Sequence, residues 1–350
     1  MARPQNKEEY RKELAETFAN ILEEKGLNWK KEWRAVGADE APRNAVTGHV
    51  YNGTNCFYLS LMAYCRGYND PRWATMIQIM DNDKKYHPGE KWHLKAGTKA
   101  VYVEYWYPYD LVKNKALTWS QYKDEIDNGR APKEFRLSTK YTAVFNASQI
   151  EGISHLPEKE KFTVPIDELV NTLSHNMNVP VFYDGGDRAY YSPSKDEIHL
   201  PAPENFTSEY ALNATALHEL AHSTGHATRL NRDIENTFGS ESYAYEELVA
   251  EITSCFMGVN LETDSTDANI DNHKAYVQSW VKEIRDKPEK LVHAIKDAQA
   301  ATTYMEEKAE IITPEESKKR NSEVMEVTAD GKVKEAENAS RTASRCRGVR

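Results

Sequence analysis

The sequence has few cysteines and no long apolar run. Only four cysteines occur in 350 residues, and none forms a Cys-x-x-Cys pair, which argues against a disulfide framework and against a thiolate zinc site. No 18 consecutive apolar residues occur, and the first residues are charged rather than apolar. We therefore expect no membrane span and no secretory signal. The low mean hydropathy of −0.76 fits the same expectation, a cytoplasmic protein.

Acidic residues outnumber basic ones overall, but the balance of charge differs between the two parts of the chain. The net charge is −10, yet residues 1–140 carry 23 Lys and Arg against 19 Asp and Glu, whereas the remainder carries 22 against 36. Six of the seven tryptophans also precede residue 125. The two parts of the chain are therefore expected to face different partners, and the length of 350 residues favours two domains, each with its own core.

A His-Glu-Leu-Ala-His motif occupies residues 218–222. Residues four apart share one face of a helix, so His218 and His222 can bind the same metal ion. Neutral imidazole is a common zinc ligand, and Glu219 can accept a proton from a water molecule at the ion. We expect a divalent ion, Zn²⁺ by default with Mn²⁺ as the alternative, and Glu219 as the general base.

Two candidates compete for the third ligand position. His226 follows the glycine that should end the helix, so the direction of its side chain is open. Position 228, where the long-spaced metzincin pattern has its third histidine, is a threonine. Farther along, Glu247 and Glu251 are four residues apart, which fits Glu247 as the ligand and Glu251 as the acid that orients a ligand histidine. Glu246 is expected to point about a quarter-turn away from Glu247.

The predicted architecture is an α+β fold in two domains, followed by a disordered tail at residues 313–350. The second domain, residues 156–312, places a small sheet before the metal-binding helix, and the edge of such a sheet can pair with an extended peptide. Its expected elements are a helix at 166–177, strands at 179–183, 188–192 and 197–200, and helices at about 208–224, 242–257, 271–287 and 288–307.

The first domain, residues 1–155, is predicted to be small and rich in aromatic residues. Its helices follow from apolar residues spaced three and four apart, and its strands from alternating apolar and polar residues. The expected elements are a helix at about 7–24, a helix through 58–62 that ends near 66–67, a helix starting at 70–75, a hairpin at 92–109 and a strand at 141–146.

Aromatic rings interleaved with Lys and Arg in this domain are typical of a surface that binds single-stranded nucleic acid. Bases stack on rings without sequence preference, and cations contact the phosphates. The alternative is that each ring belongs to the core, as most aromatic residues do. The candidate stacking residues are Trp29, Trp33, Trp73, Tyr102 and Trp106, and the candidate phosphate contacts are Lys30, Lys31, Arg34, Arg72, Lys91, Lys95 and Lys99.

Several of these segments resemble one known family. The sequence around Trp29-Lys30-Lys31, Thr47-Gly48, Tyr51-Asn52-Gly53-Thr54-Asn55, Arg72-Trp73-Ala74-Thr75, Lys95-Ala96-Gly97-Thr98-Lys99 and Val144-Phe145-Asn146 is similar to the single-stranded-DNA-binding domain of ArdC-type antirestriction proteins. The family often has Lys-Gly-Glu-Lys-Gly where this chain has Lys-Ala-Gly-Thr-Lys. Residues 218–226, 229–232 and 245–251 resemble the zincin-like metallopeptidase domain of the same proteins. The resemblance covers about residues 7–308 and adds Asn52 to the expected DNA contacts.

This resemblance implies a protein of plasmids, phages or conjugative elements that shields incoming single-stranded DNA, largely without sequence preference, and counters host restriction. Fold alone does not fix function, so a second hypothesis stays open. In it, the chain is a metallopeptidase with a protein or peptide substrate, toxin-like or regulatory, and its N-terminal domain recognises a protein partner.

Overall fold

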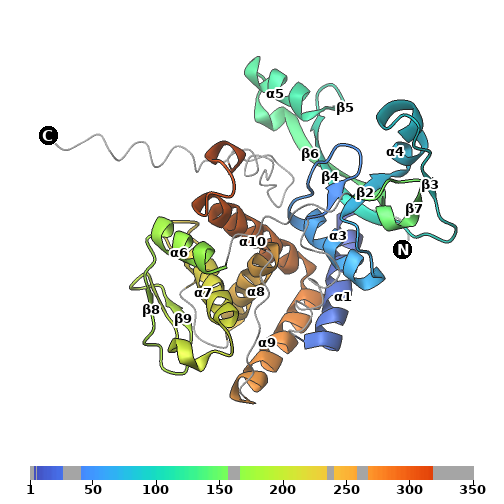
Figure 1. Cartoon of the computed structure of the whole chain (residues 1–350). Helices are drawn as coiled ribbons and strands as arrows, with labels where there is room; N and C mark the ends of the chain where they lie inside the picture. Colours follow the sequence, from blue (N-terminus) through green and yellow to red (C-terminus); the bar gives the residue numbers. More distant parts are fainter. Residues whose placement is uncertain are drawn as a thin grey trace. The chain divides into compact units, whose positions relative to one another are not determined.

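The computed structural model describes Pro4 and residues 6–26, 41–156, 166–234, 240–257 and 267–317 (Figure 1). The chain divides into two compact units, of which the first comprises residues 1–101 and 143–314 and the second comprises residues 102–142 and 315–350. The predicted domain boundary near residue 155 stays a prediction. Most of the predicted disordered tail, from residue 318 onward, lies outside the described residues.

Two helices open the first unit. α1 (Lys7–Lys25) starts where Asn6 caps it by accepting a hydrogen bond from the backbone N–H of Glu9, at 2.9 Å, and its buried face repeats every three or four residues. α3 (Gly53–Arg66) ends at Gly67, whose φ of 65° favours glycine. Both helices were predicted from apolar periodicity, and both are confirmed.

The predicted helix start at residues 70–75 is wrong in part. β2 (Arg72–Thr75) is a strand that pairs with β1 (Arg43–Asn44) on one side and with β6 (Phe135–Asn146) on the other. Thr75 does cap a helix, α4 (Met76–Asp81), in a capping box with Gln78. Sheet pairing therefore requires an extended backbone up to the residue at which the helix begins.

The predicted hairpin at residues 92–109 is also wrong. β3 (His93–Leu94) pairs with β7 (Ile150–Glu151), not with β4 (Val101–Asp110). The backbone N–H of Lys95 extends this pairing by donating to the carbonyl of Gln149 at 3.0 Å. β3 therefore pairs with a strand that lies more than 50 residues away in the sequence, and not with the next strand along the chain.

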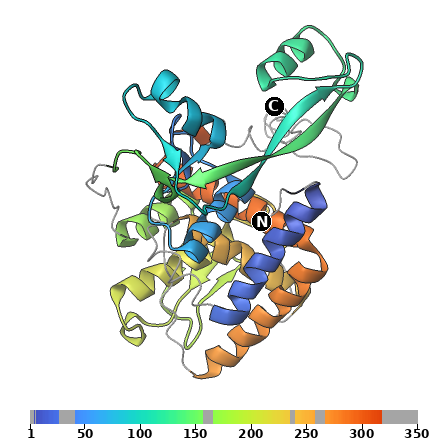
Figure 2. The same cartoon turned by 90° about the vertical axis from the view of Figure 1, so that its right-hand side faces the viewer.

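In the first unit, β1, β2 and the last residues of β6 are neighbouring strands in that order. In the second unit, the rest of β6 is followed by β4 and then by β5 (Lys115–Ala116). In the second unit, α5 (Trp119–Asp127) packs its Tyr122 against Phe135. This helix was not predicted from the sequence. Arg130 forms ion pairs with Asp110, Glu125 and Glu134. In Figure 2, β4 and β6 are the two long neighbouring arrows beside α5.

The later part of the first unit contains the elements predicted around the metal motif. Its three-stranded sheet has the order β8-β10-β9, with β8 and β10 parallel and β9 antiparallel. The elements are α6 (Ile166–Met177), β8 (Val181–Phe182), β9 (Tyr190–Ser192), β10 (Glu197–His199), α7 (Glu209–Ser223), α8 (Glu241–Phe256), α9 (Asp267–Asp286) and α10 (Pro288–Lys308). Short helical turns lie at Asn82–Tyr86, Pro132–Glu134, Ala147–Gln149 and Pro203–Asn205.

α10 contacts both the N-terminal helices and the helices of the metal motif. It packs on α8, α1 and α3, and its buried stripe includes Leu291, Ile295 and Ala298. The backbone N–H of Gly53, at the start of α3, donates to Oε1 of Gln299 at 3.0 Å. Among the described helices, none has the length and apolar character that a membrane crossing requires.

Candidate metal centre

α7 carries the His-Glu-Leu-Ala-His motif and is held on its apolar side. Ser208 caps its start by accepting a hydrogen bond from the backbone N–H of Ala211 at 3.0 Å. Leu217 and Leu220 lie in the core cluster formed with α6 and the small sheet. Because these residues are buried, the motif histidines emerge on the face that contacts α8.

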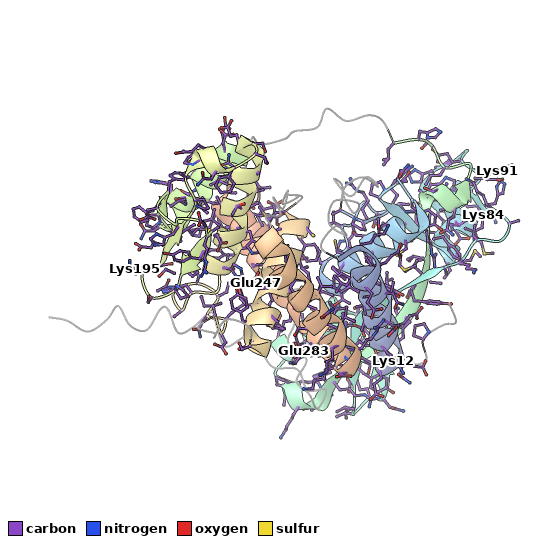
Figure 3. The ribbon with its side chains drawn as sticks, turned by 90° about the horizontal axis from the view of Figure 1, so that it is seen from below. Lys12, Lys84, Lys91, Lys195, Glu247 and Glu283 are labelled. Atoms are coloured by element: carbon purple, nitrogen blue, oxygen red, sulfur yellow. The ribbon has the colours of Figure 1, made fainter. Side chains whose placement is uncertain are left out.

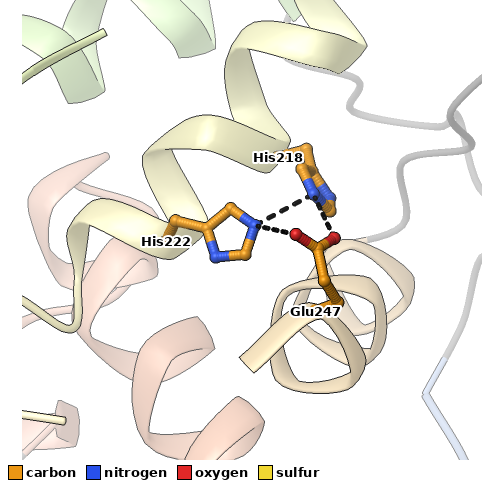
Figure 4. A group of neighbouring side chains, drawn as sticks. All are labelled: His218, His222 and Glu247. Atoms are coloured by element: carbon orange, nitrogen blue, oxygen red, sulfur yellow. Dashed lines mark hydrogen bonds and ion pairs between the residues drawn. The ribbon is translucent and has the colours of Figure 1, made fainter. Parts of the chain in front are cut away.

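The two motif histidines and Glu247 of α8 converge (Figure 4). Nε2 of His218 and Nε2 of His222 are 3.1 Å apart. Glu247 places one carboxylate oxygen 3.6 Å from Nε2 of His218 and the other 3.7 Å from Nε2 of His222. One ligand atom from each of the three residues lies within 4.8 Å of the others. The structure therefore brings together the three residues that the sequence predicts as metal ligands.

Glu246 contacts one of the two motif histidines. Nδ1 of His222 lies 3.3 Å from Oε1 of Glu246, so this edge of the ring donates to a carboxylate and Nε2 can direct its lone pair at an ion. The expected role of Glu251 is not seen, because Nδ1 of His218 is buried and has no hydrogen-bond partner among the described residues. Glu246 therefore contacts the Nδ1 edge of the His222 ring, and Glu247 faces the Nε2 edge of the same ring.

Arg232 holds Glu246 in place. Its guanidinium donates to both carboxylate oxygens of Glu246, with Nη2 at 2.6 Å from Oε1 and Nε at 3.0 Å from Oε2. The same guanidinium donates to Oγ1 of Thr224 at 2.7 Å and to the carbonyl of Ala221 at 3.2 Å, both at the end of α7. Arg232 therefore links the C-terminal turn of α7 to α8.

Glu219 lies beside the ligands and is only 7% exposed. Burial raises the pKa of its carboxyl group, and the nearby His218 and His222 together with a hydrogen bond from the backbone of Tyr191 oppose that shift only in part. Tyr191 belongs to β9, an edge strand of the small sheet. The candidate base is thus next to a strand edge with which an extended peptide could pair.

The ligand cluster is electrostatically coupled. Burial alone would lower the pKa of His222, but Glu247, Glu246 and Glu219 raise it to about 9. Burial alone would raise the pKa of Glu247, but His222, His218 and the hydroxyl of Tyr243 lower it to about 2. Without an ion, the cluster therefore pairs a protonated His222 with an ionised Glu247 at neutral pH.

This coupling predicts a pH-dependent stability for the metal-free protein. Because the pKa of His222 is raised from about 6.5 to about 9, the charged imidazole stabilises the fold fully below about pH 6.5, and this contribution is lost as the pH rises to about 9. In the presence of a chelator, the Tm of the wild type is expected to fall across that window. A His222→Gln variant should show a flatter profile, and a flat wild-type profile would contradict the prediction.

The side chains of His226 and Tyr245 make their contacts elsewhere. Nδ1 of His226 lies 2.8 Å from Oγ1 of Thr228, and His226 is not one of the three converging residues, so the geometry favours Glu247 over His226 as the third ligand. The hydroxyl of Tyr245 donates to Asp297 of α10 at 2.7 Å. The hydroxyl of Tyr243, by contrast, contacts Glu247.

The predicted nucleic-acid contacts differ in where they lie in the structure. Trp29, Lys30, Lys31, Trp33 and Arg34 lie outside the described residues. Lys91, Lys95 and Lys99 are exposed, and Figure 3 labels Lys91. Asn52 precedes α3 as its cap residue, and Tyr102 and Trp106 are half-buried.

Two of the predicted contacts need correction. The ring of Trp73 is 0% exposed, so it has no free face for base stacking. Arg72 donates to Asp70, with Nη2 at 2.7 Å from Oδ2, and to the carbonyl of Ser154 at 2.8 Å. Its charge is therefore neutralised within the protein, which argues against a phosphate contact.

The donor set fits a divalent ion. Two imidazole nitrogens and one carboxylate oxygen are the ligands of many catalytic zinc sites, and other divalent first-row ions accept the same set. The hydrogen bond from His222 to Glu246 fixes the tautomer that leaves Nε2 available. These contacts are what an ion-binding site requires of its protein ligands.

Comparisons with known proteins identify two matching families. Residues 8–145 match the N-terminal domain of the anti-restriction factor ArdC, and residues 168–298 match a zincin-like metallopeptidase family. The chain is 33% identical to a DNA primase TraC of Escherichia coli over 85% of its own length, but it spans only 27% of that relative. It is 28% identical to protein y4eC of Sinorhizobium fredii (strain NBRC 101917 / NGR234), covering 86% of this chain and 93% of that one.

A solved structure shows the same fold. The Mn(II)-bound structure of the antirestriction ArdC protein from the R388 plasmid superposes with a TM-score of 0.63 and 26% sequence identity. The superposition covers 85% of this chain and 97% of the plasmid protein. The two-domain mixed helix and sheet architecture is therefore shared with a protein that binds a divalent ion.

Proposed function

Because the chain has the two domains of the ArdC-type antirestriction proteins, we propose that it is a cytoplasmic single-stranded-DNA-binding protein of a mobile genetic element that counters restriction and carries a metal-dependent peptidase centre. The ArdC N-terminal match supports the DNA-binding part. The observation that carries the peptidase part is the convergence of His218, His222 and Glu247 beside the buried Glu219.

The side chains around the cluster support hydrolysis of a peptide bond. A divalent ion held by His218, His222 and Glu247 would polarise the scissile carbonyl and make water more acidic. Glu219 is placed to accept a proton from that water and to pass it to the leaving amine, and the raised pKa of its carboxyl group suits both transfers. The hydroxyl of Tyr243 is a candidate donor to the negative charge that develops on the carbonyl oxygen.

Zn²⁺ is the first ion to test, because the donor set of two histidines and one glutamate occurs in known zinc peptidases. Mn²⁺ is the second, since the R388 ArdC protein binds Mn(II). Affinity alone does not decide between them, because metal availability and geometry also select the ion. Metal content of the purified protein and competition between the two ions address this question.

An exposed apolar surface favours the alternative function. Met76, Ile77 and Met80 of α4 are all exposed, and three large apolar side chains on one short helix are typical of a protein contact. In this alternative, the chain is a metallopeptidase, toxin-like or regulatory, whose N-terminal part recognises a protein partner.

The salt dependence of binding separates the two functions. In fluorescence-anisotropy titrations of the full chain with a labelled oligo-dT, DNA binding is expected to weaken steeply as salt increases, because phosphate contacts release counterions. Absence of binding at low salt would contradict the DNA function and favour the protein-partner alternative. Titration with a labelled duplex of the same length is the control for single-strand preference.

A further inference from the structure

The β4–β6 ribbon of the second unit has two unlike faces. Side-chain contacts define the pairing: the hydroxyl of Tyr141 donates to Glu104 at 3.1 Å, Lys140 lies beside Tyr105, and Arg136 lies beside Tyr109. Each contact joins residues in antiparallel register, so alternate residues of each strand share a face.

One face is closed. It carries Glu104 and Asp110 of β4, both buried, together with Phe135 and Leu137 of β6. Phe135 packs on Tyr122 of α5 with ring centroids 5.1 Å apart. Tyr102 and Trp106 belong to this face, and Nε1 of Trp106 donates to Glu104 at 3.0 Å. These two predicted stacking residues are therefore on the packed face of the ribbon.

From Tyr105 onward, the opposite face is partly exposed and carries a regular set of rings and cations. Tyr105, Tyr107 and Tyr109 alternate along β4; Tyr105 is 44% exposed, and Tyr107 and Tyr109 are half-buried. Arg136 and Lys140 are exposed on β6. Nζ of Lys140 lies 4.6 Å from the ring centroid of Tyr105, and Cζ of Arg136 lies 5.0 Å from that of Tyr109. We call these five residues the tyrosine ladder.

We propose that the tyrosine ladder is a docking surface for single-stranded nucleic acid. This inference rests on the proposed DNA-binding function and assigns it to a face of the second unit. Rings that alternate along a strand are about 6.6–6.8 Å apart, so successive bases of an extended single strand can each meet a ring. Stacking of this kind tolerates any base sequence.

The charges of the ladder favour a polyanion over a peptide. Its two ionisable groups other than tyrosine are both cations, and neither forms an ion pair within the part of the chain that the structure describes. The acids Asp110, Glu125 and Glu134 are instead bound to Arg130. Phosphates could therefore approach the ladder without meeting a carboxylate on the same face.

The cations over the rings do not prevent stacking. Lys140 is exposed and has a flexible side chain, so its ammonium group can move from the ring of Tyr105 to a phosphate. An exposed cation–π contact is weaker than a base stacked on an aromatic ring. Exchange of the ammonium group for a base, with the ammonium bound to phosphate, is therefore favourable.

The test uses the full chain and a labelled oligo-dT in anisotropy titrations. The double variant Tyr105→Ala/Tyr107→Ala is expected to bind at least about tenfold more weakly than the wild type, whereas Tyr105→Phe/Tyr107→Phe keeps the rings and should bind as the wild type does. Lys140→Gln and Arg136→Gln are each expected to reduce the slope of log K against log salt by about 0.7. Tyr109 is left unchanged because its hydroxyl donates to Asn114 at 2.6 Å.

Tyr183→Ala is the matched control, because Tyr183 is an exposed tyrosine that follows β8 in the first unit. Circular dichroism checks the fold of each variant, and the single charge variants are used if the double alanine variant is misfolded.

If the ladder variants bind with wild-type affinity and an unchanged salt slope, the tyrosine ladder is not the docking surface, while the DNA-binding function stands. Failure of the wild type to bind oligo-dT would contradict both. Binding that is lost in the alanine variant but does not weaken with salt would indicate a protein contact and also overturn the inference.

Discussion

Replacing Glu219 with glutamine is expected to lower peptide hydrolysis about 10²- to 10⁴-fold, the range over which a positioned general base accelerates a reaction. Glutamine has nearly the same shape as glutamate but cannot accept the proton. Because Glu219 is not one of the three converging residues, affinity for Zn²⁺ or Mn²⁺ should change little. A quenched-fluorescence peptide library measures hydrolysis, and isothermal titration measures ion binding.

Glu204→Gln is the matched control, since Glu204 is an exposed carboxylate in the turn before α7. Its hydrolysis and ion binding should equal those of the wild type. Equal hydrolysis by the Glu219→Gln variant would remove this residue from the mechanism. A metal-loaded wild type that cleaves no library peptide would contradict the peptidase part of the proposal while ion binding by the cluster stands.

Arg232→Leu is expected to lower the free energy of unfolding by about 3–5 kcal/mol, which is the usual cost of leaving one member of a buried ion pair without its partner. The side chains of Arg232 and Glu246 are 8% and 7% exposed. The variant also frees Glu246 from the position in which it contacts His222, so ion affinity should fall by about 10- to 100-fold. Urea unfolding and isothermal titration measure the two effects.

The double variant Arg232→Leu/Glu246→Leu identifies the cause. It removes both charges, so it should be less destabilised than Arg232→Leu alone. Lys85→Gln, which breaks the exposed pair with Asp81, should leave stability nearly unchanged. A double variant at least as unstable as the single one would show that lost packing, not an unpaired charge, causes the destabilisation.

Helices were predicted well, whereas strand pairing was not. The helices α6, α7 and α8 follow from local signals, such as the cap at Ser208 and apolar residues three and four apart. By contrast, β3 pairs with β7, more than 50 residues away. Adjacent strands in the sequence usually pair, and only the packed structure shows where that rule fails.

The candidate site was predicted where it depends on local spacing. His218, Glu219 and His222 form one motif, and Glu247 was inferred from its spacing of four residues from Glu251 in the sequence. Glu246 was missed because a helical wheel places it about a quarter-turn from Glu247. An imidazole has two nitrogens on opposite edges, so neighbouring glutamates can each meet one edge of His222.

The contacts of Arg232 could not be predicted by the same reasoning. Arg232 lies in an irregular segment between α7 and α8, and its contacts with both depend on the path of that segment. The exposed face of the β4–β6 ribbon was missed for a related reason. The alternation of β4 was visible, but its partner strand, and therefore the cations beside each ring, was not.

Because α10 contacts helices of both family domains, we expect the first unit to unfold as a single cooperative structure. The N-terminal end of α10 lies next to α1, where Glu289 pairs with Arg11, and farther along Gln299 binds the start of α3 while Asp297 binds Tyr245 of α8. Separation of the two family domains would therefore expose apolar faces on both sides. Heating should melt the N-terminal helices and the metal-binding helices in one calorimetric transition, and an ion bound at α7 and α8 should protect α1 and α3 from hydrogen exchange.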